Sequence, residues 1–146
     1  MTDFQQIPIL YILPQRPPFV FVDRLLHYDE ELTRTSFRIP ADALFVEDGR
    51  FRSAGLVEHM AQSAAARTGY VARYILHSPV MIGYIGSVRK LRVLRHPRAG
   101  ETLETSVFVR QDIFGITLTD IEVRSGGELL ATASMKTATS DKEIVE

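Results

Sequence analysis

The order of apolar and polar residues divides the chain into one long helical segment flanked by strand-like segments. Residues from about 53 to about 74 place apolar side chains at helical spacing, and Ser53 is suited to cap the start of this helix. The apolar stripe consists of Val57, Met60, Ala64, Thr68, Val71 and Ile75, and a separate polar stripe consists of His59, Ser63, Arg67, Tyr70 and Arg73. We expect the apolar stripe to face the core and the polar stripe to face solvent.

Strand-like segments lie on both sides of this helix. Residues 7–13 predict one or two helical turns that end at Pro14, and residues 19–22, all aromatic or β-branched, predict a buried strand. The other predicted strands are residues 32–39, 80–93, 103–110, 116–123 and 129–135. Consecutive strands joined by short turns imply an antiparallel sheet, so the predicted fold class is α+β, with the sheet wrapped around one helix. Unpaired sheet edges favour a homodimer.

Composition limits the classes of protein to consider. The length of 146 residues predicts a single domain over residues 1–146, with a loose polar tail from about residue 140. The net charge of -1 gives no reason to expect nucleic acid as a partner. The chain has no cysteine, which excludes thiolate chemistry and agrees with a cytoplasmic location. We also expect no secretory leader, and no apolar run is long enough to span a membrane.

Glu58 is the first candidate for chemistry. At helical spacing it stacks with Ala61, Gln62 and Ala65, a face made mostly of small residues. Burying a carboxylate beside such a face is unfavourable, because its charged form loses water, so a carboxylate at this position indicates a function. The alternative is a structural role, in which the helix dipole stabilises a carboxylate early in the helix.

Four segments resemble motifs of FabZ-type 3-hydroxyacyl-(acyl carrier protein) dehydratases. Residues 13–24 read LPQRPPFVFVDR and resemble the opening motif L-P-H-R-x-P-F-x-x-V-D-R of that family. Residues 58–62, EHMAQ, resemble the helix motif E-A-M-A-Q. Residues 83–91, GYIGSVRKL, and 100–103, GETL, resemble the strand G-I-x-x-V-K-F and the turn P-G-D-x-L. The matches occur in order across nearly the whole chain.

The resemblance implies the hotdog fold, a homodimer or a trimer of dimers, and no metal or organic cofactor. It implies removal of water from 3-hydroxyacyl chains carried on acyl carrier protein, in fatty-acid or polyene-type biosynthesis. Glu58 would protonate the departing 3-hydroxyl or hold it by a hydrogen bond. Gln62, which lies one turn after Glu58 on the same side of the helix, either orients Glu58, binds substrate or only packs the helix. Gly83 and Tyr84 would bind substrate.

One catalytic residue of that family has no counterpart here. The family places a histidine in a G-H-F-P-G loop shortly before the helix, whereas residues 44–52 of this chain contain none. Position 15 is also glutamine where the opening motif has histidine. The loop resembles that of a divergent branch of dehydratases, some of which accompany the synthesis of polyene or aryl-polyene pigments.

Dehydration also needs a base, and the sequence offers two candidates. His59 is either an exposed residue of the polar stripe or a base that acts from the helix of a partner subunit. Asp48 is either a base in the loop that lost its histidine or a turn residue before Gly49. No two histidines have metal-ligand spacing, so no metal site is predicted.

Residues 89–98 form a locally basic segment. Arg89, Arg92 and Arg95 could dock an acidic acyl carrier protein, or they could be solvated strand residues. Besides a dehydratase, the sequence leaves two functions open. One is a catalytically impaired hotdog protein that binds acyl chains or an active partner subunit. The other is an acyl thioesterase that uses Glu58 on water or on the carbonyl group.

Overall fold

The computed structural model describes residues 3–143, and side chains up to residue 140. Its helical elements are η1 (Phe4–Gln6), α1 (Ile9–Ile12), α2 (Ser53–Tyr70) and the π-helical turn η2 (Val71–Ile75). Its strands are β1 (Arg24–Tyr28), β2 (Leu32–Arg38), β3 (Val46–Glu47), β4 (Arg50–Phe51), β5 (Met81–Val93), β6 (Thr102–Ile113), β7 (Ile116–Ser125) and β8 (Glu128–Glu143).

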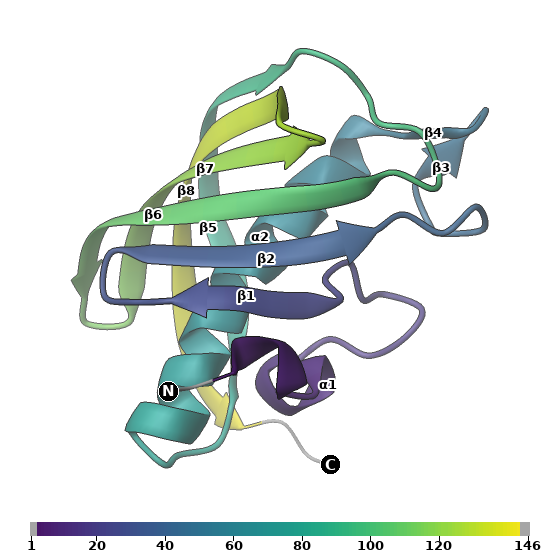
Figure 1. Ribbon diagram of the computed structural model, residues 1–146. Helices are drawn as coiled ribbons and strands as arrows, with labels where there is room; N and C mark the ends of the chain where they lie inside the picture. The colour runs from purple at the N-terminus through teal and green to yellow at the C-terminus, as the bar shows by residue number, and fades with distance from the viewer. Residues whose placement is uncertain (1–2, 144–146) are drawn as a thin grey trace.

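The larger sheet has six antiparallel strands in the order β1-β2-β6-β7-β8-β5 and curves around α2 (Figure 1). A separate hairpin, β3–β4, lies just before the helix. The α+β class and the sheet around one helix are therefore confirmed. The pairing of β5 with β8 contains three register shifts, between Met81 and Gly83, between Ile85 and Ser87, and between Arg89 and Arg92.

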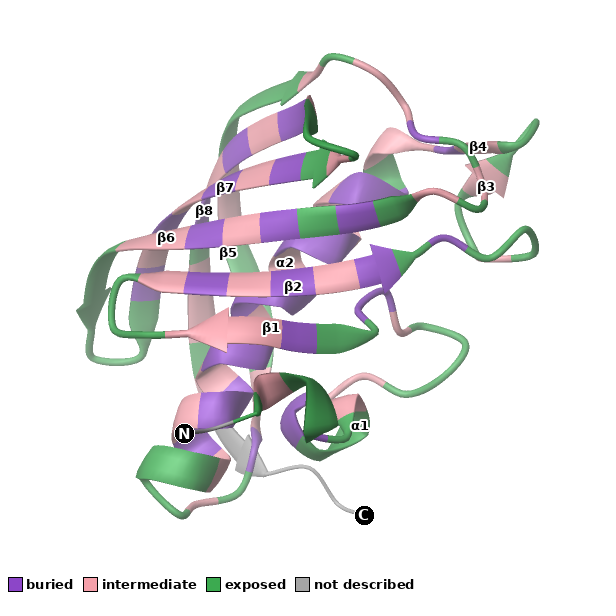
Figure 2. Cartoon of the chain, viewed as in Figure 1, coloured by how far each residue is buried: buried purple, intermediate pink, exposed green. Residues whose placement is uncertain are grey.

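The core lies between α2 and the concave face of the sheet. Leu56 and Met60 of α2 are fully buried, and they belong to one cluster with Phe37 of β2, Leu103 of β6 and Ile121 of β7. Buried and more exposed residues alternate along the central strands, as period-two side chains require (Figure 2). Each such buried side chain stabilises the fold by roughly 1.5–3 kcal/mol, so the apolar pattern is sufficient to fix the helix on the sheet.

The prediction that the polar stripe of the helix faces solvent was wrong. His59 and Ser63 are fully buried and Arg67 nearly so. The stripe packs against the sheet, where buried threonines supply partners: Thr35 bonds Ser63 at 2.8 Å and Thr105 bonds His59 at 2.6 Å. Conversely, Ile75 of the predicted apolar stripe is 50% exposed. Polar groups can be buried where each finds a hydrogen bond, and that depends on the strands opposite.

Three predicted details of local structure also differ. Residues 19–22 form no strand, because the backbone of Phe21 forms hydrogen bonds with side chains of α2 and not with a neighbouring strand. The α-helix α2 ends at Tyr70, and the chain continues as η2. Ser53, predicted to be the N-cap, is instead the first residue of α2. The N-cap is Arg52, whose side chain makes no capping hydrogen bond. The expected loose tail from residue 140 begins inside β8, and residues 144–146 lie outside the described part.

The short helix α1 packs tightly on α2 at Gly69. A Cβ atom at Gly69 would lie 1.7 Å from the carbonyl oxygen of Ile12, so any other residue would force the two helices apart. Ile12 is completely buried at this contact. The close approach places the chain that follows α1, at Pro14 and Gln15, against the face of α2 that carries Glu58.

Candidate active site

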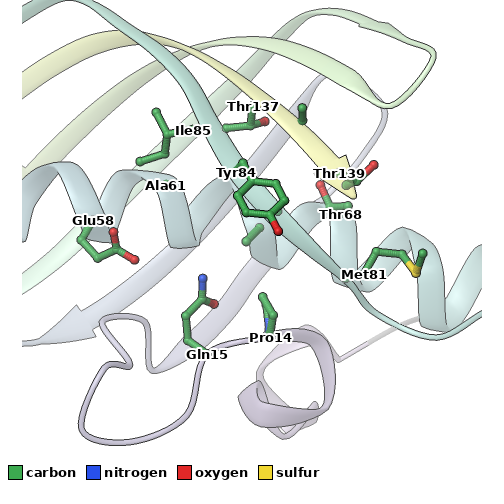
Figure 3. A pocket seen from close by; sticks show the side chains of 14 residues that line it. Pro14, Gln15, Glu58, Ala61, Thr68, Met81, Tyr84, Ile85, Thr137 and Thr139 are labelled. Atoms are coloured by element: carbon green, nitrogen blue, oxygen red, sulfur yellow. The ribbon is translucent and has the colours of Figure 1, made fainter. Parts of the chain in front are cut away.

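A cavity of about 260 Å³ lies between α2, β5, β8 and the segment after α1 (Figure 3). Its floor consists of five α2 residues at helical spacing, Glu58, Ala61, Ala65, Thr68 and Gly69. Its walls consist of Pro14, Gln15, Met81, Gly83, Tyr84, Ile85, Thr137, Ala138 and Thr139. The floor spans eleven residue steps from Glu58 to Gly69, which at about 1.5 Å per step makes it roughly 16 Å long. The small side chains between its ends leave room for an extended ligand.

Gln62 holds the carboxylate of Glu58 at one end of this cavity. The Gln62 side-chain nitrogen donates to Glu58 Oε1 at 3.1 Å and to the carbonyl oxygen of Phe19 at 2.8 Å. Its oxygen accepts from the backbone nitrogen of Phe21 at 2.7 Å. The amide of Gln62 is thus bonded on both sides, which fixes the side chain that contacts Glu58. Of the roles expected for Gln62, the geometry supports orientation of Glu58 together with packing of residues 19–21 on the helix.

His59 points away from the cavity and into the core. Its Nδ1 lies 2.6 Å from the carbonyl oxygen of Phe21, and its Nε2 lies 2.6 Å from Thr105 Oγ1. Its ring stacks on Phe37 at 5.7 Å between centroids. Burial lowers the pKa of His59 to about 4, so the ring is neutral at pH 7. Because a carbonyl only accepts, Nδ1 donates to Phe21 and Nε2 accepts from Thr105. Neither nitrogen is free to act on a substrate.

Asp48 also lies outside the cavity. It occupies the turn between β3 and β4 with a positive φ of 53°, followed by Gly49 at 76°. Its side chain is 91% exposed and lies 3.8 Å from Arg52. This geometry favours the turn role over a catalytic one. The structure therefore brings neither candidate base to Glu58.

Gly83 and Tyr84 both line the cavity, on the β5 side opposite the helix. Space remains at Gly83, where an added Cβ would lie 3.7 Å from the nearest atom, the carbonyl oxygen of Ala138. The sequence did not single out Gln15 as a site residue, yet it lines the same cavity. Its place after a proline-terminated helix gave no sign of this, because only the packing of α1 on Gly69 brings it there.

Arg95 is not available for docking an acidic protein. Its guanidinium bonds both carboxylate oxygens of Glu101 at 2.9 Å and also bonds Glu128 at 3.0 and 3.1 Å. The bonds to Glu101 and Glu128 raise the pKa of Arg95. The hydrogen bonds from Arg95 are the largest cause that lowers the pKa of Glu101 to about 2. The structure thus uses Arg95 as a link between the start of β8 and the turn before β6. Arg89 and Arg92 remain exposed on β5.

Among residues 3–140, whose side chains are described, no group of three or more His, Cys, Asp or Glu side chains is placed to hold a metal ion. None of the helices in that part of the chain is both long and apolar enough to cross a membrane.

Comparison with solved structures shows the class of protein that this fold and cavity define. A chain of the dehydratase heterocomplex ApeI:P from Xenorhabdus doucetiae superposes with a TM-score of 0.86 at 17% identity, covering 94% of both chains. The fold is therefore the hotdog fold. Residues 7–145 match the family model described as ApeP-like, ApeP dehydratase. The chain thus belongs to the ApeP-like dehydratase family, which confirms the divergent hotdog dehydratase that its motifs indicated.

More distant structures share the fold. A hypothetical thioesterase with coenzyme A from Streptococcus pneumoniae has a TM-score of 0.63 at 7% identity, covering 82% of this chain and 86% of that one. The PaaI protein from the phenylacetic acid degradation operon of E. coli has a TM-score of 0.59 at 16% identity, covering 78% and 80%. Among curated proteins, no sequence matches significantly.

Proposed function

We propose that the chain dehydrates 3-hydroxyacyl thioesters carried on acyl carrier protein, in fatty-acid or polyene-type biosynthesis, with Glu58 as the general acid. The observation that carries this proposal is the Glu58 carboxylate, oriented by Gln62 at one end of a long cavity with a floor of small residues. The acyl chain would lie along that floor. A base removes a proton from the carbon next to the thioester carbonyl, and that electron pair forms the new double bond. The C3–O bond breaks as that double bond forms, and Glu58 protonates the departing oxygen, which leaves as water.

The base would come from a partner subunit. Of the residues that line the cavity, none besides Glu58 carries a carboxylate or an imidazole that could act as the base. β5 forms one edge of the sheet, and no described segment pairs with its outer side. The other edge strand, β1, has η1 and α1 beside it (Figure 1). The similar structure from Xenorhabdus is a dehydratase heterocomplex, which supports pairing of this chain with a different subunit, and pairing with a second copy is the alternative.

Product analysis tests this function. The purified chain, alone and together with its partner subunit, is given 3-hydroxyacyl thioesters of acyl carrier protein, and products are followed by mass spectrometry. Loss of one water from the acyl chain supports the dehydratase. Release of the free acid would instead identify a thioesterase.

A second candidate function follows from the missing base. The chain would bind acyl thioesters, or an active subunit, without catalysing a reaction itself. It is favoured if the assembled complex turns over as fast with a Glu58→Gln chain as with the wild type.

Pairing through β5 predicts that a charge on this strand weakens association. Leu91, 40% exposed on β5, is replaced by lysine, because an edge lysine is unfavourable in a continuous sheet. We expect subunit affinity in sedimentation velocity to fall by roughly tenfold or more. Phe114→Lys is the matched control, since Phe114 is 99% exposed but lies in the β6–β7 turn. If Leu91→Lys leaves the affinity at the wild-type value, the partner does not pair along β5.

Docking of the carrier is assigned to the exposed Arg89 and Arg92. The double variant Arg89→Glu, Arg92→Glu should weaken binding of the acidic carrier protein by about tenfold or more at low salt and by less at high salt. Fluorescence anisotropy with labelled carrier measures this change. The double variant Arg24→Glu, Arg38→Glu alters charge equally on exposed positions of β1 and β2 and serves as control. Equal loss in both variants would indicate a general effect of net charge and no docking at β5.

A further inference from the structure

The half of the cavity far from Glu58 is suited to an apolar ligand. Figure 3 shows Met81 of β5 at the end opposite Glu58, on the side where Thr68 also lies. Apart from Glu58, no Asp, Glu, Lys, Arg or His lines the cavity. The hydroxyl group of Thr68 donates to the carbonyl oxygen of Ala64 in its own helix at 3.4 Å, so a ligand need not supply a partner for it. A hydrocarbon chain therefore fits this half.

Ala65 lies on the floor where this far half begins. It is seven residue steps beyond Glu58, which at about 1.5 Å per step is roughly 10 Å along the helix axis. On the core side of α2, by contrast, Leu56 and Met60 are large, fully buried and packed against the sheet. Protein interiors are normally close-packed, so a cavity floored by alanines at positions 61 and 65 indicates space kept for a ligand.

The length of the floor indicates the size of that ligand. An extended chain advances about 1.2 Å per bond, since three backbone bonds of a polypeptide span at most about 3.6 Å. The floor of roughly 16 Å thus accepts about a dozen bonds beyond a carbon held at Glu58. An acyl chain of six carbons would leave the space beyond Ala65 empty, whereas a chain of twelve carbons would reach it.

We propose that Ala65 selects substrates by acyl-chain length and that the protein takes 3-hydroxyacyl chains of about ten or more carbons, an inference that rests on the proposed dehydratase function. Each methylene that enters the far half is removed from water, which strengthens binding by about fourfold. Short chains do not gain this contribution. Met81 is unbranched and flexible, so the far end adapts to chains that differ by a few carbons.

The test is the ratio of affinities for a long and a short ligand, measured in a Glu58→Gln chain so that no ligand is consumed. Titration calorimetry compares 3-hydroxydodecanoyl-pantetheine with 3-hydroxyhexanoyl-pantetheine. In the parent chain the long ligand should bind about a hundredfold more tightly or better. Ala65→Leu places a larger side chain across the path and should lower this ratio by about tenfold or more. Met81→Ala enlarges the far end and should move the best ligand toward 3-hydroxytetradecanoyl-pantetheine.

The matched control is Ala54→Leu, the same change at an exposed position of α2 that does not line the cavity, and it should keep the ratio of the parent chain. Ala65→Val provides a smaller enlargement should Ala65→Leu not fold, and it should also lower the ratio. Equal or absent binding of the two ligands by the parent chain, or a ratio that enlargement at Ala65 leaves unchanged, overturns the role of Ala65. Neither result bears on loss of water in the complex with unaltered Glu58, so the proposed function is judged separately.

Discussion

Glu58→Gln should lower the rate of dehydration by the assembled complex by about 10²–10⁴-fold, the usual contribution of a general acid. The substitution keeps the shape of the side chain and an oxygen that can accept the bond from Gln62, so the fold should be unchanged. It removes only the transferable proton. Single-turnover assays that follow formation of the conjugated enoyl thioester measure the effect.

The matched control for this prediction is Glu47→Gln. Glu47 is exposed on β3 and does not line the cavity, so its loss should leave the rate within about twofold of wild type. A Glu58→Gln complex that dehydrates at the wild-type rate would contradict the acid role. Loss of rate in both variants would point to a change in the subunit interface instead.

The second large effect is a loss of stability in mild acid caused by His59. Its pKa is about 4 in the folded protein and about 6.5 in the unfolded chain, because burial disfavours the charged ring. Between these values the unfolded chain binds a proton that the folded protein does not. His59 therefore contributes its full stabilisation above about pH 6.5 and loses it as the pH falls to about 4. The shift corresponds to about 3 kcal/mol in the free energy of unfolding.

Chemical denaturation from pH 7 to pH 4 measures this loss, and His59→Gln isolates it. A glutamine at this position can donate to the carbonyl of Phe21 and accept from Thr105 but does not titrate. The variant should show a shallower pH dependence than the wild type, whatever its stability at pH 7. Carboxylates whose pKa is lowered, such as Glu101, contribute to acid sensitivity in both proteins and cancel in the difference.

His77→Asn is the control for removing a histidine as such. His77 is exposed with a positive φ of 52°, a conformation that asparagine tolerates, so the pH dependence should match that of wild type. Equal slopes for His59→Gln and wild type would show that the His59 ring is not held neutral in the core.

The candidate site could be predicted in part, because some of its features are local in sequence. Helical spacing already placed Glu58 on a face of small residues with Gln62 one turn away, and both conclusions agree with the cavity. That Gly83 and Tyr84 belong to the site was predicted from the resemblance to the dehydratase family alone. Neither the place of Gln15 in the cavity nor the ion pairs of Arg95 with Glu101 and Glu128 could be predicted, since both depend on how separate segments pack in the fold.

The sequence by itself determined the fold class and the type of most of the long elements. Period-two and period-3.6 patterns, with glycine-containing turns, act over a few residues and require only that one face of each element be apolar. Only the tertiary structure decided which residues each face of an element contacts. The polar stripe of α2 is buried because threonines on β2 and β6 bond His59 and Ser63. Residues 19–22 lie against α2 instead of forming a strand because α2 side chains bond Phe21. Hydrogen-bond satisfaction of a buried group is a property of the assembled fold, and no local pattern encodes it.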